Sequence, residues 1–238
     1  MNSGKILLLL PALNEEAALE KLASEAPPGY DVLLVDSGST DRTVELAKAA
    51  GFKVIGVRYG RGQGSGIRTG MEYFLENGYE YLVTADCDYT DVLSGLPVVV
   101  DFLRFGGYDI VLGVRDFKKQ RDYLGLTSIF VKKTVSILIR ALMGIKARDM
   151  LTGVWCFDAK AVREIAPHLQ ERGFEYGFEI LYHAWRLHLR IGESGVDFRR
   201  RAGETKLTLR QRLIQVLYGI KYGLKVVSWR LFGPGRKI

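Results

Sequence analysis

The stretch Tyr81-Leu-Val-Thr-Ala-Asp-Cys-Asp88 is an apolar segment that ends in two carboxylates one residue apart. Its apolar half predicts a buried strand, and a buried strand needs no acids at its end. Two carboxylates in this position suit Mg²⁺ or Mn²⁺, which prefer oxygen ligands and often share them with phosphates. The alternative is that Asp86 and Asp88 only cap the next turn or helix. Because strand side chains alternate, Cys87 is expected to be a small buried residue.

Short apolar runs alternate with amphipathic segments of helix length through the first half of the chain. Val32-Leu-Leu-Val35 is one such run. This alternation predicts an α/β fold with a mostly parallel central sheet and helices on both faces. The expected strands lie near residues 5–10, 31–35, 53–57, 80–85 and 109–112, and the expected helices near 15–25, 41–50, 66–77 and 95–105.

Polar residues directly follow three of these strands. They form the segments Pro11-Ala-Leu-Asn-Glu-Glu16, Asp36-Ser-Gly-Ser39 and Asp86-Cys-Asp88. In open sheets of this kind, ligands bind beyond the carboxyl ends of the strands. All three segments are therefore expected to converge on one edge of the sheet and to form one site.

The second half of the chain changes character. Residues 1–207 are expected to form one domain, and residues 208–238 a helical C-terminal extension of the same unit. The further elements expected are an amphipathic helix at 125–142, a strand or extended segment at 151–157, a helix at 175–188, a strand at 190–198 and a long helix at 208–231.

Composition narrows the classes of protein that are possible. The 238 residues are 47% apolar and 26% charged, and the net charge of +7 favours anionic partners. Two cysteines make neither a disulfide framework nor a Cys-rich zinc site, which fits a reducing compartment. The apolar run Ile6–Leu10 is too short for a signal peptide, and no uninterrupted apolar span reaches about 18–20 residues. A cytoplasmic protein is expected, free or peripheral on the cytoplasmic face of a membrane.

The glycine-rich segment Gly60-Arg-Gly-Gln-Gly-Ser-Gly66 fits neither the dinucleotide pattern G-x-G-x-x-G nor a P-loop, and it follows the third strand rather than the first. With Arg68 it could lie along a nucleotide or a sugar. The alternative is a flexible turn before a helix.

Taken together, these segments resemble the family 2 glycosyltransferases of the GT-A fold, and in particular the polyprenyl-phosphate and dolichyl-phosphate sugar synthases. The resemblance covers roughly residues 5–207. The motifs that carry it are Pro11-Ala-Leu-Asn-Glu-Glu16, Val35-Asp-Ser-Gly-Ser-Thr-Asp41, the Gly60–Gly70 loop, Ala85-Asp-Cys-Asp88, Gly113-Val-Arg115, Asp149-Met-Leu-Thr-Gly153 and Gly203-Glu-Thr-Lys206.

The resemblance implies a role for each matching residue. The residues implied to bind the nucleotide sugar are Pro11, Asn14, Glu15, Asp36, Arg68 and Asp86. Those implied to act in catalysis are Asp86, Asp88 and Arg115. The residues implied to hold the metal are Asp88, Asp86 and Thr90. Those implied to bind the acceptor phosphate are Lys133, Arg200 and Lys206. Two positions depart from the family pattern: Ser37 stands where a second Asp is common, and Thr90 where many synthases have Gln.

The resemblance also implies an activity. It is the inverting transfer of a hexose from GDP-mannose or UDP-glucose to a polyprenyl or dolichyl phosphate, with Mg²⁺ or Mn²⁺ as cofactor. A phosphate acceptor is already anionic near pH 7, so no general base is needed. The alternatives are a transferase for saccharide or other hydroxyl acceptors, which would need a base, and a non-catalytic nucleotide-binding subunit. Nucleic-acid binding is disfavoured because no base-stacking motif is present.

The C-terminal helix is basic as well as amphipathic. Its cations are Arg210, Arg212, Lys221, Lys225 and Arg230. Such a helix can lie in the interface of an anionic membrane, or its apolar stripe can pack on the domain or on a partner subunit. The expected partners are thus a nucleotide-sugar donor, a polyprenyl-phosphate acceptor, an anionic membrane surface and a membrane subunit.

Overall fold

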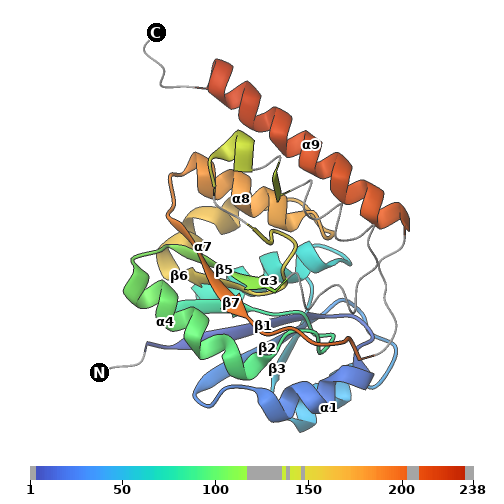
Figure 1. Ribbon diagram of the computed structural model, residues 1–238. Helices are drawn as coiled ribbons and strands as arrows, with labels where there is room; N and C mark the ends of the chain where they lie inside the picture. Colours follow the sequence, from blue (N-terminus) through green and yellow to red (C-terminus); the bar gives the residue numbers. More distant parts are fainter. Residues whose placement is uncertain (1–3, 117–135, 138–139, 146–147, 203–208, 234–238) are drawn as a thin grey trace.

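The computed structural model describes residues 4–116, 136–137, 140–145, 148–202 and 209–233. Its strands form one seven-stranded sheet in the order β3-β2-β1-β4-β6-β5-β7. Figure 1 shows this sheet between two layers of helices. The strands are β1 Ile6–Ala12, β2 Tyr30–Asp36, β3 Lys53–Gly56, β4 Tyr81–Thr84, β5 Ile110–Arg115, β6 Trp155–Asp158 and β7 Ile191–Val196.

Most neighbouring strands of the sheet run parallel, which confirms the expected α/β fold. β3, β2, β1 and β4 pair in parallel, as do β5 and β7. β6 is the exception, because it lies antiparallel between β4 and β5. The sequence predicted an extended segment near 151–157 but gave no sign of its direction.

The helices described agree closely with the expected segments. The exception is α7, which the sequence analysis did not anticipate and which begins where Asp158 caps it by accepting a hydrogen bond from the Ala161 backbone N–H at 2.7 Å. The helices are α1 Glu16–Glu25, α2 Thr43–Ala49, α3 Gln63–Glu76, α4 Leu96–Gly106, α7 Ala159–Ile165, α8 Tyr176–Arg186 and α9 Leu209–Phe232, with the 3₁₀ turns Leu93–Gly95 and Ala166–His168.

The sheet is buried on both faces, which explains why its strands read as continuous apolar runs. Along β1, Leu7 and Leu9 belong to the core under α3, α7 and α8, whereas Leu8 and Leu10 belong to the core under α1, α2 and α4. All four leucine side chains are at most 1% exposed. Burial of both faces fixes the register, since a slip by one residue would exchange the two sets.

The strand ends that carry polar residues leave the sheet at the same edge. Ala12 at the end of β1 lies beside Asp36 at the end of β2 in the parallel register. The Ser37 backbone N–H donates to the Ala12 carbonyl at 2.9 Å, and that of Ala85 donates to the Leu9 carbonyl at 3.2 Å. The segments after β1, β2 and β4 therefore share one edge, as the sequence predicted.

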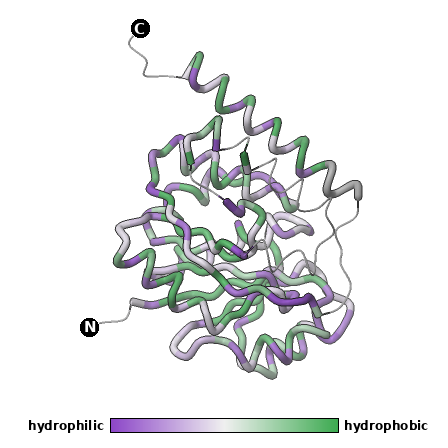
Figure 2. Tube along the Cα trace, viewed as in Figure 1, coloured by the Kyte–Doolittle hydropathy of each residue, from purple (hydrophilic) through white to green (hydrophobic). Residues whose placement is uncertain are grey.

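The long C-terminal helix α9 has one buried and one exposed apolar side. Tyr222 and Val226 are fully buried and belong to the same core as α8, while Leu217 and Leu224 are each 63% exposed. Figure 2 shows hydrophobic and hydrophilic positions mixed along this helix. None of the helices among the described residues is long and apolar enough to span a membrane. Of the helix expected at 125–142, residues 136–137 and 140–142 are helical and the rest lies outside the described residues.

Candidate active site

Asp86 follows β4 and is held by residues from three other segments. Its Oδ1 accepts a hydrogen bond from Gln63 Nε2 at 2.6 Å, and its backbone N–H donates to Asp91 Oδ2 at 2.9 Å. The backbone of Gly153 lies directly against this carboxylate, because a Cβ placed on Gly153 would come within 2.4 Å of Asp86 Cγ. Gln63, Asp91 and Gly153 thus fix where the Asp86 carboxylate can lie.

Asp88 uses both of its carboxylate oxygens in hydrogen bonds. Oδ1 accepts from the Thr90 backbone N–H at 2.9 Å and from Thr90 Oγ1 at 2.6 Å. Oδ2 accepts from Arg201 Nη1 at 2.9 Å. Thr90 therefore orients Asp88 in a local turn, and Arg201 supplies its positive charge.

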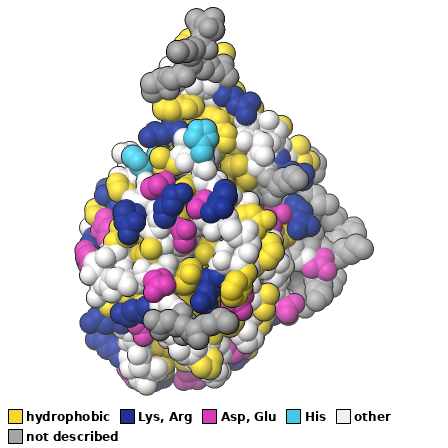
Figure 3. Space-filling model, turned by 90° about the vertical axis from the view of Figure 1, so that its left-hand side faces the viewer, with side chains coloured by type: hydrophobic (Ala, Val, Ile, Leu, Met, Phe, Trp, Pro, Cys, Tyr) yellow, Lys and Arg dark blue, Asp and Glu magenta, His cyan; other side chains and the backbone are white. Residues whose placement is uncertain are grey.

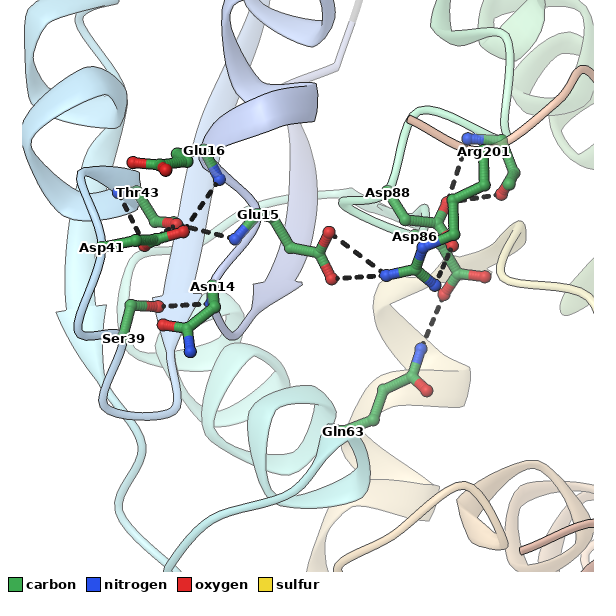
Figure 4. Close-up of polar contacts among 11 residues, drawn as sticks. Asn14, Glu15, Glu16, Ser39, Asp41, Thr43, Gln63, Asp86, Asp88 and Arg201 are labelled. Atoms are coloured by element: carbon green, nitrogen blue, oxygen red, sulfur yellow. Dashed lines mark hydrogen bonds and ion pairs between the residues drawn. The ribbon is translucent and has the colours of Figure 1, made fainter. Parts of the chain in front are cut away.

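Arg201 joins two of the three strand ends. Besides Asp88, its guanidinium donates from Nη2 to both oxygens of Glu15, at 2.9 and 3.3 Å. Figure 4 shows the guanidinium between the two carboxylates, with Gln63 approaching Asp86 nearby. This residue was missed in the sequence analysis, which selected its neighbour Arg200.

The sequence alone could not single out Arg201 among the three consecutive arginines 199–201, because the choice depends on how this segment pairs with another loop. Residues 198–202 run alongside the loop after β4: the Arg199 backbone N–H donates to the Thr90 carbonyl at 3.0 Å, and that of Ala202 to the Asp88 carbonyl at 3.1 Å. In such an extended segment alternate side chains share a face. Arg199 accordingly turns inward to Glu25 and to the Tyr89 ring, as Arg201 turns to Asp88, while Arg200 is exposed.

Burial and mutual repulsion disfavour ionisation of the carboxylates behind Arg201. Burial, followed by the charges of Asp88 and Asp91, raises the pKa of Asp86, and burial also raises the pKa of Asp91. The Arg115 charge lowers both pKa values without reversing either shift. In addition, Asp91 Oδ1 is buried without a hydrogen-bond partner. Ionisation of Asp86 and Asp91 together would therefore be favoured by a further positive charge close to them.

Arg115 is itself deeply buried, with 5% of its side chain exposed. It donates to Asp149 through Nε at 2.6 Å and Nη2 at 3.0 Å, and to the Leu151 carbonyl at 2.7 Å. The structure thus places this predicted catalytic residue behind the carboxylates, where its charge acts on Asp86 and Asp91. Asp149, which the sequence analysis quoted only as part of a motif, is its ion-pair partner.

The residues expected at the nucleotide form a hydrogen-bonded edge beside Glu15. Asp36 accepts from the backbone N–H groups of Gly38 and Ser39 at 3.0 and 3.1 Å, and from Ser39 Oγ at 2.5 Å. Asn14, at a positive φ of 52°, donates its backbone N–H to Ser39 Oγ and accepts from the Thr40 backbone N–H at 2.8 Å. Asn14, Glu15, Arg201 and Asp88 follow one another along one edge (Figure 4), and Asp36 adjoins them through its hydrogen bonds to Ser39.

The glycine-rich segment is closely packed. A Cβ on Gly62, whose φ is 139°, would come within 2.1 Å of the Arg172 carbonyl oxygen, and a Cβ on Gly66 within 2.9 Å of Pro11 Cβ. These approaches allow α3 to begin at Gln63 beside Asp86. Arg68 lies further along α3, where it stacks on the Tyr59 ring at 3.6 Å and pairs with Glu72 at 3.4 Å. The remaining candidates, Lys133 and Lys206, lie outside the described residues.

The carboxylate cluster fits a divalent cation that is shared with a ligand. No three acidic, histidine or cysteine side chains in the described part of the chain are grouped to hold an ion by themselves. Asp86 and Asp88 can still supply one or two oxygens, which is how Mg²⁺ is usually held when phosphates complete its shell. The orphaned Asp91 Oδ1 and the raised pKa values of Asp86 and Asp91 also call for added positive charge.

Comparison with known families gives a match over residues 8–165, to the profile described as glycosyl transferase family 2. Among curated proteins, the chain is 27% identical over 215 residues to the undecaprenyl-phosphate mannosyltransferase of Micrococcus luteus, covering 86% of this chain and 88% of that protein. It is 28% identical over 206 residues to the dolichyl-phosphate hexose transferase of Haloferax volcanii, covering 85% of this chain and 86% of that protein.

Comparison with solved structures supports the fold. Glucosyl-3-phosphoglycerate synthase from Mycobacterium tuberculosis, in complex with Mn²⁺, UDP-glucose and phosphoglyceric acid, superposes with a TM-score of 0.74 at 21% identity. The match covers 95% of this chain and 80% of that one. At this identity the likeness shows a shared GT-A architecture.

Proposed function

The chain belongs to glycosyl transferase family 2, and from this premise we propose that it transfers a hexose from a nucleoside-diphosphate sugar to a polyprenyl phosphate, with inversion and with the help of Mg²⁺ or Mn²⁺. The observation that carries the proposal is the carboxylate cluster of Asp86, Asp88 and Asp91 at the carboxyl edge of the sheet, in which Asp88 and Asp91 are buried and Asp86 is partly buried. Its raised pKa values and its orphaned oxygen suit a cation bound to a diphosphate.

On the donor side, each residue has a physical task. Asp88 would hold the cation, oriented by Thr90, and Asp86 would face the donor sugar, fixed by Gln63 and Gly153. Asn14, Glu15 and Asp36 would line the nucleotide along the neighbouring edge. The cation, when bound, would neutralise charge on the departing diphosphate. Buried Arg115 adds fixed positive charge close to the same carboxylates.

On the acceptor side, the proposal is supported by the chemistry of the relatives and by basic side chains. Two relatives are named as transferases for undecaprenyl phosphate and dolichyl phosphate. Arg200 is exposed next to Arg201 and is free to meet a phosphate, and we assign the same task to Lys133 and Lys206. An anionic phosphate oxygen can attack without a general base, which matches a site in which the buried carboxylates serve the donor.

The test is a matrix of donors and acceptors. Purified protein would be incubated with GDP-mannose or UDP-glucose, with Mg²⁺ or Mn²⁺, and with a short polyprenyl phosphate, a free polyprenol or a simple saccharide. We expect a chloroform-soluble glycosyl phosphate only from the phosphate acceptor, and its loss on chelation with EDTA. Transfer to the saccharide alone would instead establish a hydroxyl-directed transferase.

A lipid acceptor also suggests how the protein meets its substrate. The outward side of α9 carries Leu217, Ile220, Leu224, Val227 and Leu231, all exposed and spaced by three or four residues. This outer stripe forms one apolar line along a helix that also carries basic residues. The pattern is typical of helices that lie in an anionic membrane interface. We propose that the outer stripe of α9 rests on the membrane that holds the acceptor.

The basic residues of α9 differ in how free they are to meet lipid. Lys221 pairs with Glu171 at 2.7 Å, and Arg230 lies over the Trp185 ring at 5.7 Å. Replacing apolar residues of the outer stripe with polar ones is therefore the cleaner test. Leu217→Gln with Leu224→Gln should lower cosedimentation with phosphatidylglycerol vesicles several-fold, whereas Phe105→Gln on α4, which is 78% exposed, should not. Unchanged binding would contradict the membrane proposal and favour a protein partner for this side.

A further inference from the structure

Arg201 spans the gap between the carboxylates of two different strand ends. It reaches Asp88 at 2.9 Å and Glu15 at 2.9 Å, and the exposed fractions of the three side chains are 21%, 13% and 12%, in the order Arg201, Asp88, Glu15. Charge-assisted hydrogen bonds with this little exposure are screened weakly by water. We call this arrangement the Arg201 bridge.

The Arg201 bridge uses Asp88 Oδ2, the carboxylate oxygen that the hydrogen bonds from Thr90 leave available to a cation. Oδ1 of Asp88 already accepts two hydrogen bonds from Thr90, and Oδ2 accepts the one from Arg201. A divalent ion and a guanidinium repel each other and both require carboxylate lone pairs. Their occupancy of Asp88 is therefore antagonistic, and each must lower the affinity of the site for the other.

The backbone around Arg201 is anchored by contacts that do not involve the Arg201 guanidinium. On one side, Arg199 ties the segment to Glu25 and donates from Nε to the Tyr89 carbonyl at 2.8 Å. On the other side, the Ala202 backbone N–H donates to the Asp88 carbonyl. The Arg201 Nε, by contrast, is buried without a hydrogen-bond partner. The guanidinium thus has an unused donor, and its release from Asp88 and Glu15 would leave the anchors of its loop intact.

We propose that Arg201 is a tethered counter-ion, which holds Asp88 and Glu15 until a metal-bound diphosphate displaces it. This rests on the proposed function only in that Asp88 is its metal ligand. A metal ion alone would have to displace the guanidinium and would bring no hydrogen-bond acceptor to replace the lost carboxylate. A metal–diphosphate complex brings its own oxygens, on which the freed guanidinium can donate in bidentate fashion. The Arg201 bridge thereby favours loading of metal and nucleotide together over binding of metal alone.

The test measures Mn²⁺ binding by calorimetry without donor sugar or acceptor, so no catalytic turnover enters the readout. Arg201→Gln should bind Mn²⁺ more tightly than the wild type, by on the order of tenfold. Arg163→Gln removes the same charge from an exposed position on α7, outside the proposed site, and is the control, with affinity expected to stay within about twofold. In the presence of UDP or GDP, the advantage of Arg201→Gln over the wild type should shrink or reverse.

A second variant covers the case in which Arg201→Gln does not fold. Arg201→Lys keeps the charge but cannot reach both carboxylates with a planar fork, so its Mn²⁺ affinity should fall between those of the wild type and Arg201→Gln. An Arg201→Gln or Arg201→Lys affinity equal to or weaker than that of the wild type would overturn the proposal, even if glycosyl transfer is established. If the wild type and every variant fail to bind Mn²⁺ even with nucleotide, the metal assigned in the proposed function is wrong and the counter-ion proposal falls with it.

Discussion

Buried aspartates at the two opposite edges of the sheet behave in opposite ways. Asp109, just before β5, is 2% exposed. It accepts hydrogen bonds from the Arg190 backbone N–H at 2.7 Å, from the Arg190 guanidinium at 3.2 and 3.3 Å, and from Lys160 at 3.4 Å. Burial acts to raise its pKa, but the hydrogen bonds from Arg190 prevail and the pKa is lowered. At the carboxyl edge, burial instead raises the pKa of Asp86 and Asp91.

The difference shows at which edge of the sheet the protein's own side chains pair the buried carboxylates. At the amino-terminal edge, acidic and basic side chains lie interspersed on the surface (Figure 3). Asp109 forms ion pairs there with Lys160 and Arg190. At the carboxyl edge, Asp91 retains a buried oxygen without a partner. Buried charge is costly unless it is paired. The first edge therefore stabilises the fold, while the incomplete pairing at the second edge supports our proposal that it takes a cation and an anionic ligand from outside.

The largest expected effect is at the carboxyl edge. Asp88→Asn should lower glycosyl transfer by on the order of 10³-fold, because the cation would lose its charged ligand. Initial rates at saturating donor and thermal unfolding measured on the same preparation would check this. Asp109→Asn is the matched control and should keep the wild-type rate at temperatures where it is folded. An Asp88→Asn rate within tenfold of the wild type would break the comparison.

A smaller effect is expected from moving a carboxylate without removing it. Gly153→Ala would place a Cβ within 2.4 Å of Asp86 Cγ, so the carboxylate must turn away. A misplacement of about 1 Å can cost roughly 10²-fold in rate, and a loss of that size is expected in transfer assays. Gly95→Ala, whose Cβ would meet nothing within 4 Å, should leave the rate unchanged. Equal rates for the two variants would show that the position of Asp86 does not matter.

At the amino-terminal edge, the expected effect is on stability instead of rate. Asp109→Asn should lower the free energy of unfolding at pH 7 by about 1–3 kcal/mol, since charged hydrogen bonds to Arg190 are lost. Urea unfolding would measure it. The depressed pKa means that this stabilisation is present above the ordinary Asp pKa of about 4 and fades as the pH falls through the folded-state value. A difference from the wild type that persists at pH 2 would point to packing as its cause.

The smallest expected effect is the contribution of Asp86 to the pH dependence of the free energy of unfolding, which has the opposite sign to that of Asp109. A raised carboxyl pKa means that the folded state retains a proton which the unfolded state has lost, so stability should fall as the pH rises above about 4. In EDTA, the wild type should lose stability relative to Asp86→Asn with a slope below about 1.4 kcal/mol per pH unit. His183, whose pKa is lowered to about 4 chiefly by burial, acts in the opposite direction, but equally in both proteins. If the stability of the wild type and of Asp86→Asn changed in parallel with pH, the electrostatic distinction between the two edges would be wrong.

The fold could be predicted well from the sequence because its signals are local. Strand and helix periodicity placed β1 to β5, α1 to α4, α8 and α9 within a few residues of their observed bounds. The antiparallel direction of β6 could not be predicted, since its short apolar run Trp155-Cys-Phe157 indicates a strand in either direction. The inner and outer sides of α9 were equally undecided, because both are apolar and only packing on α8 separates Tyr222 from Leu224.

The candidate site divides along the same line. The amino-acid sequence by itself determined that the segments after β1, β2 and β4 end in polar residues and share an edge, because parallel strands align their carboxyl ends. Only the tertiary structure decided that Arg201 joins Glu15 and Asp88, that Arg200 does not, and that Asp91 keeps an unpartnered oxygen. Arg201 and Glu15 are 186 residues apart in the chain. Periodicity reports only on neighbours within a few turns, whereas the pairing of distant charges depends on how the complete chain excludes water around them.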